Sequence, residues 1–231
     1  MNINFTKNVR YELMYGYQAK AELDRRGIVY LALGSLELHG SHLPMGLDVI
    51  KAHAMCCVLA QRLGGVVFPP HYYSAVHKLP GERSEWLARN WGNIYQEETA
   101  KASVVETVGQ IRRMGTKVCA LYTGHYPQAQ LDMVEEIAAE TDAPAEGFNV
   151  IVCPEKKLSG GGDHAGVNET SLLLYLNRDL VDMSAINEQG YVDHHWTGAL
   201  DPRLASAARG EELAGIITAY MEEKIGRAMP E

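Results

Sequence analysis

Short apolar runs alternate with longer helical segments along the chain, and this alternation limits the fold more than any other feature of the sequence. Short apolar runs bounded by Gly or Pro are typical of buried strands, and they occur at residues 27–33, 65–68, 117–122 and 148–153. Apolar residues at helical spacing, with start and stop signals, predict helices at residues 48–63, 93–114, 127–140, 168–176 and 210–228. Strands and helices in alternation predict an α/β fold, a three-layer α/β/α sandwich with a mainly parallel central sheet.

The size and composition of the chain favour one globular unit. Its 231 residues, 46% of them hydrophobic, suffice for one sizeable core, and no linker divides them, so we expect a single domain over residues 1–231. The net charge of -8, without a basic run, argues against a nucleic-acid partner. The sequence has neither a membrane-spanning apolar run nor a signal-peptide pattern, so we expect a cytoplasmic protein without a membrane partner. The four cysteines are expected in the core, because their spacing suggests neither disulfides nor a thiolate metal site.

Polar side chains follow the predicted strands at the sheet edge where open parallel sheets bind ligands. Glu37 and His39 follow the first strand two residues apart, so an extended chain would direct both to the same face. Asp48 opens the next helix, and His125 follows the third strand after Gly124. Each residue alone is more often a solvated loop residue. Their convergence at one edge favours a site for zinc, manganese or iron, with a carboxylate able to bridge two ions.

A second group follows the fourth strand. Three consecutive glycines precede Asp163 and His164, and Glu169 opens the next helix. The glycines lack the pattern of a phosphate-binding loop, so we interpret them as a mobile flap. We also expect long loops at residues 70–92 and 184–204, where the adjacent His194 and His195 are interpreted as solvated.

These segments together resemble the creatininase (creatinine amidohydrolase) family. The hallmark G-S-x-E-x-H-G-x-H-L-P-x-x-x-D stands at residues 34–48 with every fixed position filled. The weaker matches are residues 74–81, similar to the Ser/His loop of the family, residues 123–125, similar to Asn-Gly-His, and a segment at residues 198–210. Residues 164–171 match the His-Ala-Gly-x-x-Glu-Thr-Ser segment. The resemblance covers most of the chain. The matches at residues 34–48 and 164–171 are the specific ones.

The resemblance implies roles for particular residues. The metal ligands would be Glu37, His39, Asp48 and His125, with Asp48 bridging two divalent ions, most readily zinc, with manganese or iron as alternatives. His164 would be the acid/base residue, supported by Glu169. The residues expected to bind the substrate are Ser74, His77, Tyr126 and Asp163. The family also implies a homo-oligomer, a hexamer, and Trp86 and Trp91 are candidates for an interface or a lid, with core packing as the alternative.

One departure from the family pattern bears on the substrate. Creatininase has a glutamate ligand of the second ion two residues after the histidine that corresponds to His125, and here that position is Pro127. The chain is therefore interpreted as a relative of creatininase whose substrate is not creatinine. Glu169 or water would complete the second ion site, and a mononuclear site is the alternative.

The expected reaction is hydrolysis of the C–N bond of a small amide, lactam or formamide by metal-activated water. Two other readings stay open. One is a hydrolase, isomerase or lyase acting on a cyclic ketone or keto-sugar with the same ions. The other is a non-catalytic homologue that acts as a binding or assembly subunit; Pro127 favours this reading, and His164 and Glu169 oppose it.

Overall fold

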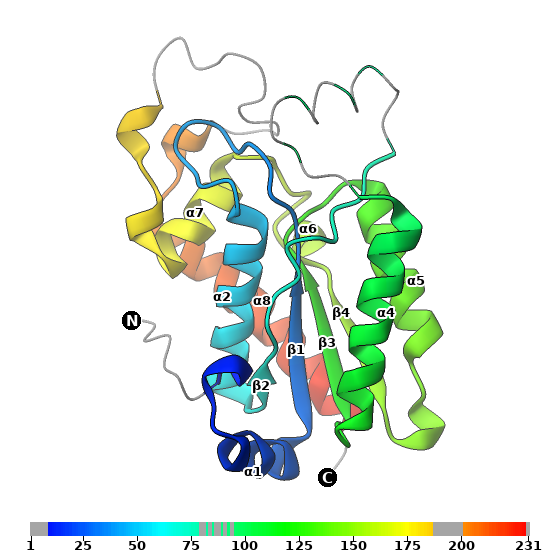
Figure 1. Cartoon of the computed structure of the whole chain (residues 1–231). Coiled ribbons are helices and arrows are strands. Elements are labelled where there is room, and N and C mark those ends of the chain that lie inside the picture. The colour runs from blue at the N-terminus through cyan, green and yellow to red at the C-terminus, as the bar shows by residue number, and fades with distance from the viewer. Residues whose placement is uncertain are drawn as a thin grey trace.

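A computed structural model describes residues 9–78, 82, 85, 89, 92, 95–186 and 201–229 of the chain. Its centre is one sheet of parallel strands in the order β2-β1-β3-β4 (Figure 1). The strands are β1 (Ile28–Leu33), β2 (Val66–Val67), β3 (Val118–Thr123) and β4 (Asn149–Cys153), which confirms the four predicted ones. The last residues of β1 and β3, Leu33 and Thr123, lie opposite each other. The loops that leave these two strands therefore start at the same level of the sheet edge.

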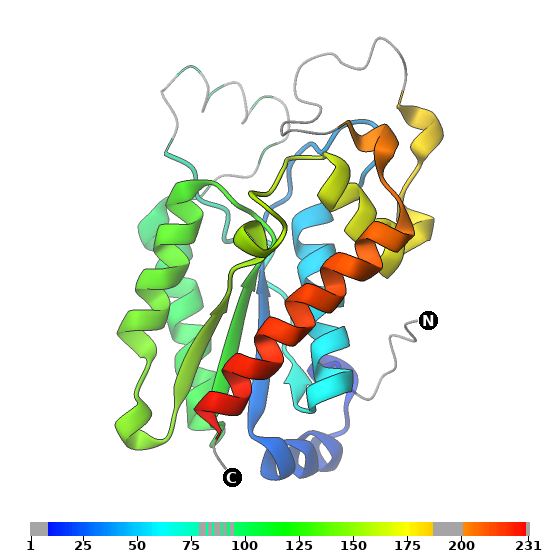
Figure 2. The same cartoon turned by 180° about the vertical axis from the view of Figure 1, so that it is seen from behind.

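Helices cover both faces of the sheet, so the predicted α/β class is confirmed. Figures 1 and 2 show α2 (Leu47–Leu63), α7 (Val167–Leu176) and α8 (Ala207–Ala228) on one face. The other face is covered by α4 (Glu97–Arg113) and α5 (Gln128–Thr141). The other helices whose bounds the structure describes are α1 (Gly16–Arg26) and the single-turn α6 (Glu155–Leu158). The 3-10 turns are η1 (Tyr11–Leu13), η2 (Pro144–Glu146), η3 (Arg178–Leu180), η4 (Met183–Ala185) and η5 (Pro202–Leu204).

Strand β1 divides the core into two layers because successive side chains point to opposite faces. Ile28, Tyr30 and Ala32 pack into the cluster that includes α2 and α8. Val29, Leu31 and Leu33 pack into the cluster that includes α4 and α5. All six are completely buried, which explains why the strand reads as a continuous apolar run. Burial of a large aliphatic side chain contributes about 1.5–3 kcal/mol, so this strand anchors both layers.

Several sequence-based boundaries are corrected by the structure. Helix α1 was not predicted. Helix α4 begins at Glu97, since Tyr95 and Gln96 are not helical, and the described residues Glu82, Glu85 and Arg89 are helical within the segment predicted as a long loop. Helix α8 begins at Ala207, earlier than predicted, because the Ser206 side chain accepts a hydrogen bond from the Arg209 amide and caps the helix. The predictions for Trp86, Trp91, His194 and His195 lie outside the described residues.

The four cysteines are free and buried, as expected; they are Cys56, Cys57, Cys119 and Cys153. In the described part of the chain, no helix combines the length and apolarity that crossing a membrane requires.

Candidate metal centre

The candidate ligands come from different elements that end at the same edge of the sheet. Glu37 and His39 lie in the loop that leaves β1, and this loop is closed by a hydrogen bond from the Glu37 amide to the Met45 carbonyl. Asp48 lies in the first turn of α2, and His125 follows β3. All four predicted ligands are buried, with exposed fractions of 1–6%. The structure therefore brings the predicted ligand set together in one protected place.

Asp48 lies between two histidines. Its Oδ1 is 3.1 Å from Nε2 of His39, whereas its Oδ2 is 3.0 Å from Nδ1 of His125. Ser35 donates its hydroxyl hydrogen to the same Oδ2 at 2.7 Å, which fixes the rotation of the carboxylate. A carboxylate that presents one oxygen to each of two nitrogen ligands has the arrangement expected of a bridge between two ions.

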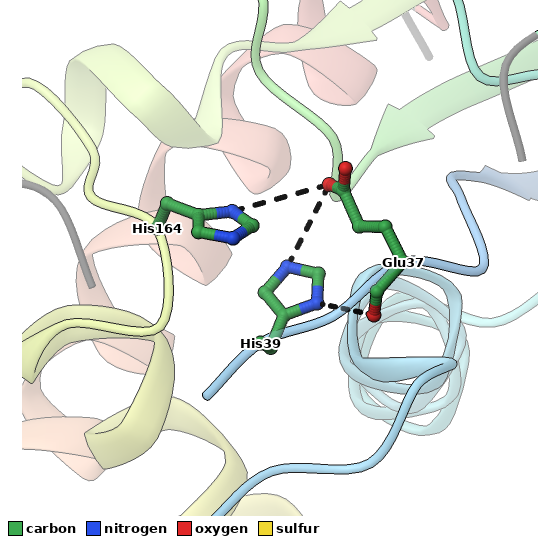
Figure 3. Close-up of side chains that lie close together, drawn as sticks. All are labelled: Glu37, His39 and His164. Carbon is green, nitrogen blue, oxygen red and sulfur yellow. Dashed lines mark hydrogen bonds and ion pairs between the residues drawn. The ribbon is translucent and has the colours of Figure 1, made fainter. Parts of the chain in front are cut away.

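Glu37 contacts the same ring nitrogen of His125 as Asp48 does. Its Oε1 is 2.9 Å from Nδ1 of His125, 3.8 Å from Nε2 of His39 and 3.9 Å from Nδ1 of His164. Figure 3 shows the side chains of Glu37, His39 and His164 directed toward one another. Three overlapping sets of side chains have ligand atoms within 4.8 Å of one another: Glu37, His39 and His164; Glu37, His77 and His125; and His39, Asp48 and Glu169.

The surroundings of the histidine ring nitrogens indicate whether these residues suit a metal ion. Nδ1 of His39 is 3.1 Å from the carbonyl oxygen of Glu37, which only accepts, so Nδ1 carries a hydrogen and Nε2 is the nitrogen that offers a lone pair to an ion once its own proton is displaced. Nε2 of His39 and Nε2 of His125 are buried and have no hydrogen-bond partner among the described residues. Buried polar atoms are nearly always paired, but in the described part of the chain Nε2 of His53 and Nε of Arg26 outside the centre are also unpaired, so these two nitrogens favour a metal ion only together with the carboxylates around them. A ring nitrogen fixed by a carbonyl group, with the other nitrogen free, is typical of a metal-binding histidine.

The electrostatics of the centre favour cations. Burial lowers the pKa of His39, but the negative charges of Asp48 and Glu169 outweigh it and raise the pKa to about 9. Burial likewise opposes protonation of His125, yet Glu37 and Asp48 raise its pKa to about 10. Burial alone would raise the pKa of Glu37, but the charge of His125 lowers it to about 2. Without an ion, protons thus occupy the histidines and balance the carboxylates, and a divalent ion would replace them.

His164 lies at the edge of the centre, where its side chain is 30% exposed. Its Nε2 is 2.9 Å from the carbonyl oxygen of Leu38, so Nε2 donates and Nδ1 keeps a free lone pair. Burial, together with the nearby His39, lowers the pKa of His164, which leaves the ring neutral near pH 7. The next residue, Ala165, has a φ of 52°, the only non-glycine positive φ in the described residues. Strain of this kind gathers at functional sites, here beside the predicted acid/base residue.

Glu169 acts on His164 through its charge. Its Oε1 is 2.6 Å from Nζ of Lys51, and its Oε2 accepts a hydrogen bond from the Ala165 amide at 2.8 Å. The negative charge of Glu169 partly counters the lowering of the His164 pKa. Nε2 of His39 is 3.8 Å from Oε2 of Glu169, so Glu169 belongs geometrically to the candidate ligands.

The residues predicted to bind the substrate have different surroundings. His77 lies at the centre, with its ring 4.8 Å from that of His125. Ser74 is fully buried and donates to the His71 carbonyl. Asp163 accepts hydrogen bonds from the amides of Asn168 and Glu169, which places it at the start of α7. The side chains of Ser74 and Asp163 thus form hydrogen bonds with neighbouring backbone groups.

Sequence reasoning missed Lys51 and Glu155. Lys51 is completely buried and its Nζ is 3.0 Å from Oε1 of Glu155, and Tyr126 hydrogen-bonds to both. The signal available in the sequence is a lysine one turn after Asp48 in the apolar-rich first half of a helix. A lysine buried without a partner is strongly unfavourable, so this position indicates a buried acidic partner.

Comparison with known proteins places the chain in a family. A family model described as "Creatininase: Creatinine amidohydrolase" matches residues 12–225. A protein named "Creatinine amidohydrolase" from Pseudomonas putida is 29% identical over 193 residues, which cover 72% of this chain and 69% of that protein.

Solved structures of creatininase have the same fold. A mutant creatininase of "Zn-Zn type" aligns with a TM-score of 0.70 and 22% identity over 98% of this chain and 100% of the other. A structure titled "Creatininase Mn" aligns with a TM-score of 0.71 and 22% identity over 97% and 100% of the two chains. The match to the family model spans nearly the whole chain and includes every residue of the candidate centre, so the chain belongs to the creatininase family.

Proposed function

We propose that the chain is a metal-dependent amidohydrolase that hydrolyses the C–N bond of a small amide, lactam or formamide. The observation that carries the proposal is the buried cluster in which Nε2 of His39 and Nδ1 of His125 lie 2.9–3.1 Å from the carboxylates of Glu37 and Asp48. Membership of the creatininase family supports the proposal, and so do the creatininase structures whose names include zinc or manganese. Zinc is the first candidate because mixed nitrogen and carboxylate ligands suit it, and manganese or iron are alternatives.

Glu37, Asp48 and His125 would hold one ion, and His39 and Asp48 lie where a second would be held. The bound metal would supply Lewis-acid polarisation of the substrate carbonyl and a lowered pKa for the attacking water. The protein contributes a fixed and buried ligand set. Ser35 holds the Asp48 carboxylate and the Glu37 carbonyl holds the His39 ring, so the ligands do not have to reorganise when the substrate binds.

His164 is suited to moving a proton. The Leu38 carbonyl accepts the hydrogen of Nε2 and so leaves Nδ1 as the basic atom, 3.9 Å from Oε1 of Glu37. Nδ1 can accept the proton released when water attacks the carbonyl and donate it to the departing nitrogen. Its lowered pKa means that the ring starts neutral near pH 7, as this sequence of transfers requires. Because the side chain is partly exposed, it can reach a substrate that enters from solvent.

The substrate is proposed to differ from creatinine. Pro127 has no side-chain donor, and it lies at the start of α5. His77, which is 18% exposed, lies near Glu37 and is the predicted substrate-binding residue best placed to line the entrance. Tyr126 uses its hydroxyl on Lys51 and Glu155, so we assign it a supporting role.

Variants at the centre separate metal binding from turnover. Glu37→Gln and His125→Ala should lower zinc content to well under one ion per chain while the protein stays folded, because these side chains are ligands at the sheet edge. His164→Ala should keep its zinc and lose turnover by about 10²–10⁴-fold, the usual contribution of a positioned acid/base group. Elemental analysis and circular dichroism check the first result, and initial rates check the second.

A screen of lactams, formamides and cyclic ketones in heavy-oxygen water identifies the reaction. Hydrolysis places solvent oxygen in the product, whereas isomerisation or elimination does not. His53→Gln, on a histidine of α2 outside the candidate centre, is the matched control and should keep both zinc and turnover. The proposal fails if carefully purified protein binds less than about one ion per chain, which is the behaviour of a non-catalytic homologue.

A further inference from the structure

The second ion position has a distinctive ligand set in this chain. His39, Asp48 and Glu169 each offer one ligand atom within 4.8 Å of the others, and each residue is at most 2% exposed. The Nε2 atom of His39 is buried and lies 3.1 Å from Oδ1 of Asp48, yet among the described residues it makes no hydrogen bond of good geometry. Pro127 offers no ligand atom. Glu37 and Glu169 both have a carboxylate oxygen 3.8 Å from Nε2 of His39, and Glu37 pairs with His125 at the first ion position, so Glu169 is the carboxylate left to join His39 and Asp48.

Lys51 holds Glu169 from the side away from His39. Its Nζ is 2.6 Å from Oε1 of Glu169, while Oε2 of the same carboxylate is the oxygen near His39. The Ala165 amide donates to Oε2 and fixes the plane of the group. Each oxygen of Glu169 thus has a fixed direction. A carboxylate oxygen has two lone pairs, so Oε2 can accept the amide hydrogen and still bind an ion.

Lys51 is itself fixed by a second buried acid. Its Nζ is 3.0 Å from Oε1 of Glu155, and the hydroxyl of Tyr126 lies between them and contacts both. Tyr122 donates to the other oxygen of Glu155 at 2.5 Å. Burial disfavours the charged form of Lys51, but Glu155 and Glu169 reverse this and raise its pKa, so the side chain is an ammonium. Glu155 balances the charge of Lys51, which leaves Glu37, Asp48 and Glu169 to balance bound ions.

We propose that Lys51 is a positioning residue, which directs Glu169 to complete the second ion position with His39 and Asp48 in the absence of a ligand at Pro127. This rests on the proposed metal-dependent function. The competing possibility is that the ammonium replaces the second ion. The geometry favours positioning, because Nζ engages Oε1 and leaves Oε2 facing His39.

The experiment measures zinc stoichiometry and stepwise affinity, which do not depend on a known substrate. The full-length protein is stripped with a chelator and titrated with Zn²⁺, by calorimetry and native mass spectrometry. The key variant is Lys51→Met combined with Glu155→Gln, which removes one positive and one negative charge and so leaves the core charge-balanced. Glu155→Gln alone tests the support of Lys51, and Lys20→Met, on the exposed lysine that pairs with Asp24, is the matched control.

The wild-type protein and Lys20→Met should bind two ions. The double variant should fold, keep the first ion and bind the second at least about tenfold more weakly. Glu155→Gln alone should weaken binding of the second ion by a smaller factor.

If Lys51 served general stability only, the double variant would have a lower melting temperature without a selective loss of affinity for one ion. The inference is overturned if the double variant binds both ions with wild-type affinity, or, where the double variant does not fold, if Glu155→Gln alone binds both ions with wild-type affinity. It is also overturned if the wild type binds one ion and the double variant binds two, as expected if the ammonium replaces an ion. Binding of no ion by the wild type would instead reject the proposed function.

Discussion

At the scale of single residues, Gly124 is a position at the candidate metal centre where close packing leaves no space for a side chain. Other residue types could adopt the backbone conformation of Gly124, since its φ is not positive. The limit is space, because a Cβ atom at this position would lie 2.1 Å from the backbone oxygen of Asp48. The glycine allows the close approach of the chain after β3 to α2, which places His125 beside Asp48.

Gly124→Ala should therefore disturb the centre. We expect destabilisation of about 1–3 kcal/mol from overpacking, with weaker zinc binding because Asp48 is displaced. Gly109→Ala in α4 is the control, since the nearest atom to a Cβ there is at 3.7 Å. That substitution should stabilise the protein by about 0.4–1 kcal/mol. Chemical denaturation and zinc titration measure both effects, and equal stability of the two variants would refute this reading of Gly124.

The histidine ligands predict how zinc binding depends on pH. The pKa values of His39 and His125 are raised to about 9 and about 10 in the ion-free protein, so both rings are protonated at neutral pH. Zinc must displace these protons, so its apparent affinity should rise with pH up to about pH 9, by about tenfold per pH unit for each proton released. Calorimetry in buffers of different ionisation enthalpy counts the protons. Affinity that stays constant between about pH 6 and about pH 9 would contradict the prediction.

At the scale of elements, the contact between α7 and α8 supports the centre, because α7 carries Glu169. A Cβ atom on Gly210 of α8 would lie 2.0 Å from the carbonyl oxygen of Ser171 in α7. Ser171 in turn accepts a hydrogen bond from the Ser206 amide at the start of α8. Glycine at this position allows the two helices to meet closely.

Gly210→Ala should push α8 away from α7 and destabilise the protein by about 1–3 kcal/mol. Gly215→Ala in the same helix is a matched control, because a Cβ atom there has no neighbour within 4 Å. Helix propensity predicts that the control gains up to about 1 kcal/mol. The two melting temperatures should therefore move in opposite directions, and a shift in the same direction would argue against close helix packing at Gly210.

Individual strands and helices also show which parts of the fold a sequence pattern can predict. Strand β1 was predicted because all its side chains are buried, which produces a continuous apolar run. Helix α1 was missed because only Ala19 of its residues is buried, so it has no apolar stripe that would reveal a helix. The start of α8 was placed too late because the residues after the cap Ser206 are Ala207, Ala208 and Arg209, which form no apolar stripe that would reveal a helix.

At the scale of the whole molecule, the resemblance to the creatininase family leads us to predict a homo-oligomer, a hexamer. Light scattering after size exclusion should give a mass several times that of the 25.5 kDa chain. Tyr15 and Tyr17 are 70% and 72% exposed in the single chain, and an assembly could cover such side chains. A mass equal to that of one chain across micromolar concentrations would reject the prediction.

The sequence alone determined the α/β class and the identity of the predicted ligands. Burial on both faces makes strands apolar, and metal ligands are recognisable by residue type, so both leave a local pattern at positions such as Glu37, His39 and Asp48. Tertiary structure decided how these residues share the centre. Lys51, Glu155 and Glu169 are far apart in the chain, and their pairing arises only when α2, α6 and α7 meet at the sheet edge. No local pattern records such a contact, because its energy depends on burial and on partners supplied by other elements.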